Sequence, residues 1–130
     1  MKILVGYNGS EVAKSALALA KSYAKMQHAL VYVVMSLEGG VGEKIEEINE
    51  AAENLKFAQD FLERDGIRCR TEQLVRGLTP GEDLVQFATE NEIDHLFVGI
   101  EKRSKTHKML LGSTAQYVIL KAPCPVTSVK

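Results

Sequence analysis

The segment from residue 99 to residue 114 concentrates residue types that can bind an anion. Gly99 has no side chain, so the backbone there can come close to a ligand. Gly112, Ser113 and Thr114 stand at the start of an expected helix, whose free N–H groups and positive dipole end favour a phosphate. Between these two points the chain carries Lys102, Arg103, Lys105 and Lys108. The segment indicates a phosphate-binding loop, although a solvated basic loop before an ordinary capped helix explains the same residues.

Other motifs of nucleotide, metal and hydrolytic chemistry are absent from the sequence. It contains no G-x-x-x-x-G-K-[ST] loop, no G-x-S-x-G elbow, and no G-x-G-x-x-G after its first expected strand. The three histidines have no companions at metal-ligand spacing, and the two cysteines form no CxxC pair. We therefore expect no metal site and no rapid hydrolysis, because no general base can be assigned from the sequence.

The elements that must position this segment alternate along the chain. Apolar and β-branched runs predict strands at 2–7, 29–35, 67–75, 94–99 and 125–129. Helical spacing of apolar residues predicts helices at 11–27, 44–65 and 79–92, and a last helix from 113 that ends before Pro123. The run at 67–75 is more polar than the others, so we expect it near an edge of the sheet.

Local signals mark the ends of several of these elements. Residues 8–10, Asn-Gly-Ser, are turn formers after the first strand. Thr79 and Glu82 form a capping box around Pro80, and residues 113–116 predict a second capping box, with Ser113 as the cap. Gly66 predicts a left-handed cap after the second helix. The apolar stripe of that helix is expected to consist of Ile45, Ile48, Ala52, Leu55, Ala58 and Leu62.

Five strands that alternate with four helices predict an α/β fold: an open, mostly parallel five-stranded sheet with helices on both faces. The length of 130 residues predicts one domain, 1–130. In such sheets a ligand binds beyond the carboxyl ends of the strands, at the point where the strand order reverses. The segments expected to meet there are 6–10, 35–40, 75–79 and 99–113.

Composition narrows the partners that we expect. Hydrophobic residues make up 45% and charged residues 25%, with a net charge of −1, which argues against a basic nucleic-acid-binding protein. The longest apolar run, 29–35, is too short to span a bilayer, and the N-terminal residues lack the features of a signal peptide. Two isolated cysteines suggest reduced thiols. We expect a soluble, cytoplasmic protein without nucleic-acid or membrane partners.

The order and spacing of short motifs resemble the universal stress protein family over nearly the whole chain. The nucleotide motif of that family is Gly, two residues, Gly, nine residues, then Gly followed by Ser or Thr. Gly99 and Gly112-Ser113 match this motif, with nine residues between positions 102 and 112. Residues 2–5, 8–10 and 30–34 are similar to its first strand, Asp-Gly-Ser turn and second strand, and 111–118 and 122–126 to its C-terminal signature. The resemblance implies a Rossmann-like fold of the adenine nucleotide alpha hydrolase type.

The resemblance also implies a ligand and its contacts. In ATP-binding members of the family, adenine and ribose lie at the positions of Gly6, Asn8 and Val33. The triphosphate, with Mg²⁺, lies at the positions of Gly99, Lys102, Gly112, Ser113 and Thr114, beside the basic residue Arg103. Members are usually homodimers, which implies pairing through the last strand, 125–129, whose edge is otherwise bare.

Two residues depart from the family pattern. Asn8 stands in place of the usual Asp and keeps an acceptor oxygen without the charge. Lys102 stands in place of the second motif glycine, where it either blocks the phosphate path or brings a cation to it. Three functions follow from these residues: a stress-response protein that binds ATP without rapid turnover, a dimeric interaction module that binds no nucleotide, and, least favoured, a slow ATPase.

Overall fold

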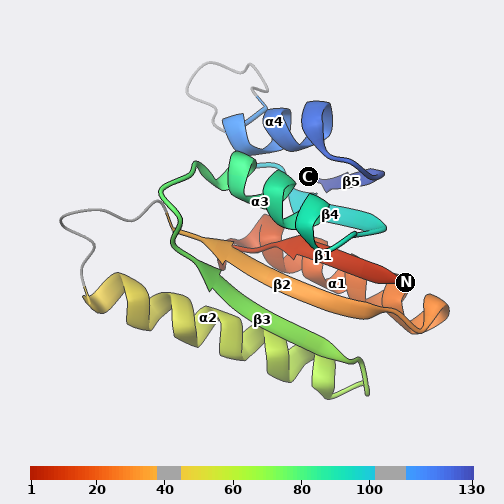
Figure 1. Cartoon of the computed structure of the whole chain (residues 1–130). Helices are drawn as coiled ribbons and strands as arrows, with labels where there is room; N and C mark the ends of the chain where they lie inside the picture. Colours follow the sequence, from red (N-terminus) through yellow and green to blue (C-terminus); the bar gives the residue numbers. More distant parts are fainter. Residues whose placement is uncertain (38–44, 102–110) are drawn as a thin grey trace.

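The computed structural model describes residues 1–37, 45–101 and 111–130. In these residues strands and helices alternate along the chain (Figure 1). The elements are β1 (Lys2–Gly6), α1 (Glu11–Gln27), β2 (Leu30–Ser36), α2 (Ile45–Glu63), β3 (Cys69–Leu74), α3 (Pro80–Glu90), β4 (His95–Gly99), α4 (Ser113–Lys121) and β5 (Val126–Val129). Each expected element is present, with ends that differ by two residues or fewer, within the usual uncertainty of element boundaries.

The five strands form one parallel sheet in the order β3-β2-β1-β4-β5. The fold class expected from the sequence is therefore confirmed, as is the edge position of the polar third strand. From β1 the chain builds outward through β2 to β3, and it then returns to the other side of β1 for β4 and β5. The strand order thus reverses between β1 and β4, which is where open α/β sheets leave a crevice for a ligand.

Helices cover both faces of the sheet, and each face has its own hydrophobic core (Figure 1). Ile3 and Val5 of β1 pack with buried residues of α1 and α2, whereas Leu4, between them, packs with residues of α3 and α4. This alternation is the two-residue period of a strand that is buried on both sides. Both faces of the central strands are therefore occupied by helices, and a ligand has access at the ends of the strands.

Two local signals read from the sequence have the expected geometry. The side chain of Thr79 accepts the backbone N–H of Glu82, and the backbone N–H of Thr79 donates to the Glu82 carboxylate, which completes the capping box of α3. Gly66 has a φ of +74° after the end of α2, and the N–H of Ile67 donates to the carbonyl of Leu62. The capping box therefore fixes where α3 begins, and Gly66 fixes where the chain leaves α2.

The expected stripe of α2 is wrong in its first half. Ile45 is 77% exposed and Ile48 is 42% exposed, and Ala52 is also exposed. The buried residues are Ala51, Leu55, Ala58 and Leu62, so the buried face of α2 passes through Ala51 instead of Ala52 and begins after the first turn of the helix. The periodicity of the apolar residues identified the helix and the buried face of its second half, but it could not show where along the helix contact with the core begins.

In the described ranges no helix combines the length and the apolar character needed to cross a membrane.

Candidate functional site

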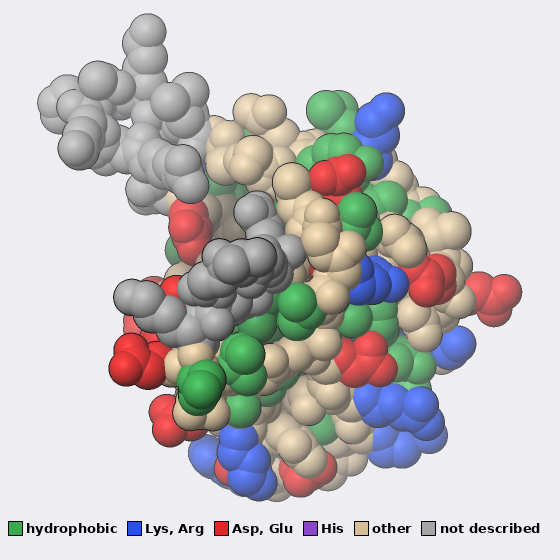
Figure 2. Space-filling view, turned by 60° about the vertical axis from the view of Figure 1, so that its left-hand side comes forward, with side chains coloured by type: hydrophobic (Ala, Val, Ile, Leu, Met, Phe, Trp, Pro, Cys, Tyr) green, Lys and Arg blue, Asp and Glu red, His purple; other side chains and the backbone are tan. Residues whose placement is uncertain are grey.

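A pocket lies at the carboxyl ends of β1, β2 and β4, between the first turns of α1, α3 and α4. Figure 2 turns this side of the molecule forward and shows acidic, basic and apolar side chains interspersed on it. The pocket is lined by Gly6, Tyr7, Asn8, Ser10, Ala13, Val34, Ser36, Pro80, Leu84, Val98, Gly99, Glu101, Gly112, Ser113, Thr114 and Ala115. Its position is the one that the strand order assigns to a ligand.

Six of the residues selected from the sequence meet in this pocket: Gly6, Asn8, Gly99, Gly112, Ser113 and Thr114. Val33 does not line it, because its side chain points to the α1 and α2 side of the sheet, where it is buried in the core. Its neighbours Val34 and Ser36, which point to the other face of β2, line the pocket instead. Lys102 and Arg103 lie outside the described residues.

The absence of a side chain has a different consequence at each glycine of the pocket. A Cβ on Gly99 would lie 2.7 Å from the carbonyl carbon of Val12, so the close packing of α1 on β4 requires this glycine. A Cβ on Gly6 would lie 2.8 Å from a methyl carbon of Leu84. Gly112 has an ordinary φ of −61°, and among the described residues no atom beyond its chain neighbours lies within 4 Å of the Cβ that it lacks. The missing side chain at Gly112 therefore leaves open space at the pocket without serving the packing of the described residues.

The start of α4 differs from the capping box predicted for it. The N-cap is Gly112 and makes no side-chain cap, Ser113 is the first helical residue, and the amide of Gln116 donates to the carbonyl of Leu111 at 3.3 Å. The first turns of α1 and α3 contain acidic residues, whereas that of α4 contains none. The predicted box is wrong because the chain enters the helix one residue earlier than the Ser-x-x-Gln pattern implies. The first turn thus presents its N–H groups and the Ser113 hydroxyl without a capping side chain.

Asn8 and Glu101 form a polar pair at the pocket. The Asn8 side-chain oxygen accepts the N–H of Ser10 at 3.0 Å, and its amide nitrogen donates to the Glu101 carboxylate at 2.7 Å. Sequence reasoning missed Glu101, although an acidic residue two positions after the strand-end glycine of a basic segment was a signal that could have found it. Both the oxygen and the nitrogen of the Asn8 side chain are therefore hydrogen-bonded.

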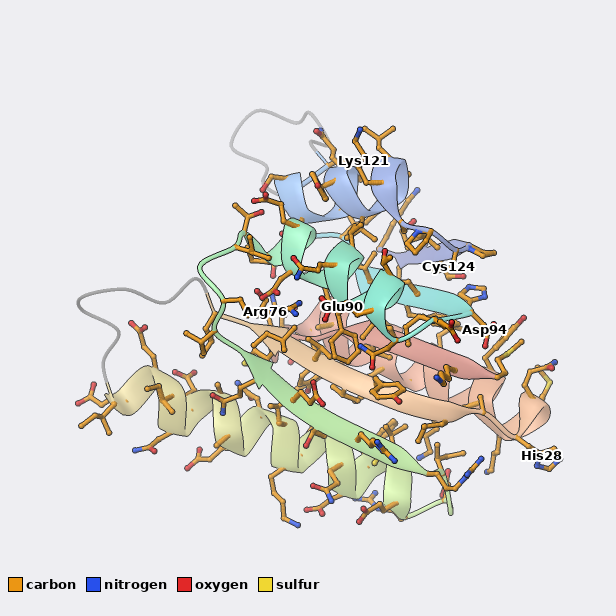
Figure 3. The ribbon with its side chains drawn as sticks, in the orientation of Figure 1. His28, Arg76, Glu90, Asp94, Lys121 and Cys124 are labelled. Carbon is orange, nitrogen blue, oxygen red and sulfur yellow. The ribbon has the colours of Figure 1, made fainter. Side chains whose placement is uncertain are left out.

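A buried acidic residue supports the β2 side of the pocket. Asp83 has a fully buried side chain; it accepts the hydroxyl of Ser36 at 2.6 Å and pairs with the Arg76 guanidinium at 2.6 Å. Arg76 also pairs with Glu90, the last residue of α3, at 3.0 Å, and both residues are labelled in Figure 3. This network ties the end of β2 to the first turn of α3, and so fixes one wall of the pocket.

Tyr7 follows β1 and is buried, and its hydroxyl has no hydrogen-bond partner in the described part of the chain. Burial, with the charge of Glu11, raises its pKa, so the phenol stays neutral at physiological pH.

Among the described residues, no group of three or more His, Cys, Asp or Glu side chains could hold a metal ion. Cys124 lies near Asp94 at the opposite ends of the strands (Figure 3), and burial raises the pKa of its thiol.

Comparison with known proteins finds a matching family model, related sequences and similar solved structures. The model of the "Universal stress protein family" matches residues 1–130. A universal stress protein of Methanocaldococcus jannaschii is 32% identical, over 99% of this chain and 81% of the relative. The structure of a universal stress protein from Archaeoglobus fulgidus has a TM-score of 0.88 and 40% identity, covering 99% of this chain and 96% of the other. A structure from the same organism in complex with dAMP has a TM-score of 0.81 and 36% identity, covering 99% and 95%.

Proposed function

This chain belongs to the universal stress protein family, and from that membership we propose that it binds an adenine nucleotide in the carboxyl-edge pocket. The observation that carries the proposal is the start of α4: Gly112, Ser113 and Thr114 line the pocket, no cap from a described side chain is present, and the first turn holds no acidic residue. Such a helix start favours a phosphate group. The dAMP complex of the Archaeoglobus fulgidus relative supports the class of ligand.

The lining divides into an apolar and a polar part, as nucleotide sites do. Val34, Leu84 and Val98 supply an apolar wall on the α3 side for the base, and Asn8 and Ser113 supply polar groups for ribose and phosphate. We propose Gly6, Asn8, Gly99, Gly112, Ser113 and Thr114 as contacts. Lys102 and Arg103 remain phosphate contacts predicted from sequence alone, and ATP with Mg²⁺ remains the ligand that the family comparison implies.

Binding without rapid turnover is the mode that we propose. Among the described lining residues, the ionisable side chains are those of Glu101 and of Tyr7, which is buried. The Glu101 carboxylate accepts a hydrogen bond from Asn8, and the Tyr7 phenol has a raised pKa. The neutral phenol of Tyr7 is not poised to act as a base for activating water, which supports a binding role.

The variant Gly112→Ser tests the site with little expected cost in stability. Serine is a better N-cap than glycine, and no described atom beyond the chain neighbours lies within 4 Å of the new Cβ, so the unfolding midpoint is expected to stay or rise slightly. The added side chain enters the space proposed for phosphate, and calorimetric titration with AMP and ATP, with and without Mg²⁺, is expected to show at least tenfold weaker binding, about 1.4 kcal/mol. Folded wild-type protein that takes up neither nucleotide at millimolar concentration contradicts the proposal.

We also propose that two copies pair through β5 and that the protein acts in stress responses in the cytoplasm. β5 pairs with β4 along one edge, and no other described strand pairs with its second edge. Nearby on α4, Ile119 is 44% exposed and Leu120 is 77% exposed. An interaction module without nucleotide would keep the same dimer. Native mass spectrometry of the purified protein distinguishes the two functions, because it reports subunit number and bound nucleotide together.

A further inference from the structure

We infer that Glu101, held in place by Asn8, makes the pocket favour a nucleoside monophosphate over a nucleoside triphosphate. The inference rests on the proposed nucleotide binding and names the class of nucleotide that the same site selects. It treats Asn8 and Glu101 as one feature of this chain, a specificity-determining pair, because their side chains are joined by a hydrogen bond of 2.7 Å and both line the pocket.

The position of Asn8 requires an amide. One side of its side chain must accept the N–H of Ser10 at 3.0 Å, and the other must donate to Glu101. An amide supplies both an acceptor and a donor, whereas an ionised carboxylate supplies acceptors alone. An Asp at this position would still accept from Ser10, but its second oxygen would face the Glu101 carboxylate. The amide of Asn8 is therefore better suited than a carboxylate to pair with an acidic residue at position 101.

The pair places a negative charge where a polyphosphate would have to fit. Glu101 is the one acidic side chain among the described lining residues, and none of these residues is basic. Its carboxylate repels phosphate, and the repulsion grows with the number of phosphate charges near it. A monophosphate can occupy the first turn of α4, at Ser113 and Thr114, with less negative charge in the pocket than a triphosphate brings. The discrimination therefore acts mainly against the longer phosphate chain.

The competing role for the Glu101 carboxylate is to hold Mg²⁺ together with the phosphates of a nucleotide. Its hydrogen bond from Asn8 uses one oxygen, and the described residues offer no second acidic side chain in the pocket to share a cation. Oxygen-ligated cations such as Mg²⁺ are usually held by one or two carboxylates together with substrate phosphates. A role for Glu101 in holding Mg²⁺ predicts the opposite response to neutralisation, so the two roles can be separated by experiment.

The test uses Glu101→Gln, Asn8→Asp and the double variant, each titrated with AMP and with ATP in EDTA and in Mg²⁺. The change Glu101→Gln removes the charge, while the oxygen of the new amide can still accept from Asn8. We expect Glu101→Gln to tighten ATP binding about tenfold relative to AMP binding at low salt, and the gain to shrink as salt is added. This ratio compares two ligands in one variant, so a general loss of structure does not change it.

The stability of the same variants tests the pair without any ligand. Asn8→Asp sets two carboxylates against each other and is expected to lower the urea midpoint. The double variant restores the hydrogen bond with the donor and acceptor exchanged, so its midpoint is expected to recover toward that of the wild type.

An unchanged ATP-to-AMP ratio in Glu101→Gln, with both nucleotides bound, overturns the inference and leaves the proposed function standing. A weaker affinity for ATP in Mg²⁺ overturns it in favour of a cation-holding role. Equal midpoints for Asn8→Asp and the double variant show that the pair is not coupled, and they also overturn it. If neither wild type nor any variant binds a nucleotide, the proposed function itself fails, and this inference fails with it.

Discussion

Loss of the buried carboxylate of Asp83 is expected to be among the most damaging single changes to this fold. Its side chain is fully buried and accepts a hydrogen bond from Ser36 and another from Arg76, each at 2.6 Å. Removing one partner of a buried ion pair costs about 3–5 kcal/mol, because the other is left without compensation. The Arg76 side chain is 28% exposed and can recover some hydration, so we expect a value near the lower end, about 3 kcal/mol, for Asp83→Ala.

The variant Asp83→Asn separates charge from shape. Its oxygen can still accept from the charged Arg76, and its N–H can donate to the Ser36 hydroxyl, so the bond with Ser36 changes from a charged hydrogen bond to a neutral one. Charged hydrogen bonds contribute about 1.5–3 kcal/mol and neutral ones about 0.5–1.5 kcal/mol, which predicts a loss of about 1–2 kcal/mol. The ordering wild type, then Asn, then Ala is the expected result.

Glu90→Gln is the matched control, because Glu90 pairs with the same arginine at 3.0 Å but its side chain is 50% exposed. Exposed ion pairs contribute about 0–1 kcal/mol, so this variant is expected to unfold close to the wild type. Urea denaturation followed by circular dichroism measures all three variants, with the slope of each transition checked for equality. If Asp83→Ala and Glu90→Gln lose the same free energy, burial does not govern the strength of this network, and the reasoning is refuted.

Two further changes test other features of the fold. Gly99→Ala places a Cβ 2.7 Å from the backbone of Val12; overpacking of this kind costs about 1–3 kcal/mol, and an unchanged melting temperature would show that α1 is free to move off β4. His95 is partly buried and bonded to Thr127 at 2.7 Å, and burial lowers its pKa below the usual 6.5. The unfolded chain therefore takes up the proton first as pH falls through 6.5, so the unfolding free energy should decline below that pH, with a smaller decline in His95→Gln if the assignment holds.

The sequence by itself determined the order of the elements and the class of fold. Strands buried on both faces need continuous apolar runs such as residues 31–35, and amphipathic helices need apolar residues at helical spacing. Both patterns are local, so they can be recognised without knowing which elements pack against them. The strand-end glycines and the residues at the start of the last helix could be identified in the same way, because turns and helix starts depend on a few neighbouring residues.

Only the tertiary structure decided what each of these residues does. Gly99 was selected for close approach to a ligand, whereas its missing Cβ makes room for the backbone of α1, a helix that lies far from it in the sequence. Val33 and Val34 are indistinguishable by type, and the direction in which each points from β2 places Val33 in the core beneath α1 and α2 and Val34 in the opposite core, where it also lines the pocket. The pairing of Asn8 with Glu101, separated by 93 positions, depends on the neighbouring positions of β1 and β4 in the sheet. Such contacts between distant segments have no local pattern, because strand order alone brings them together.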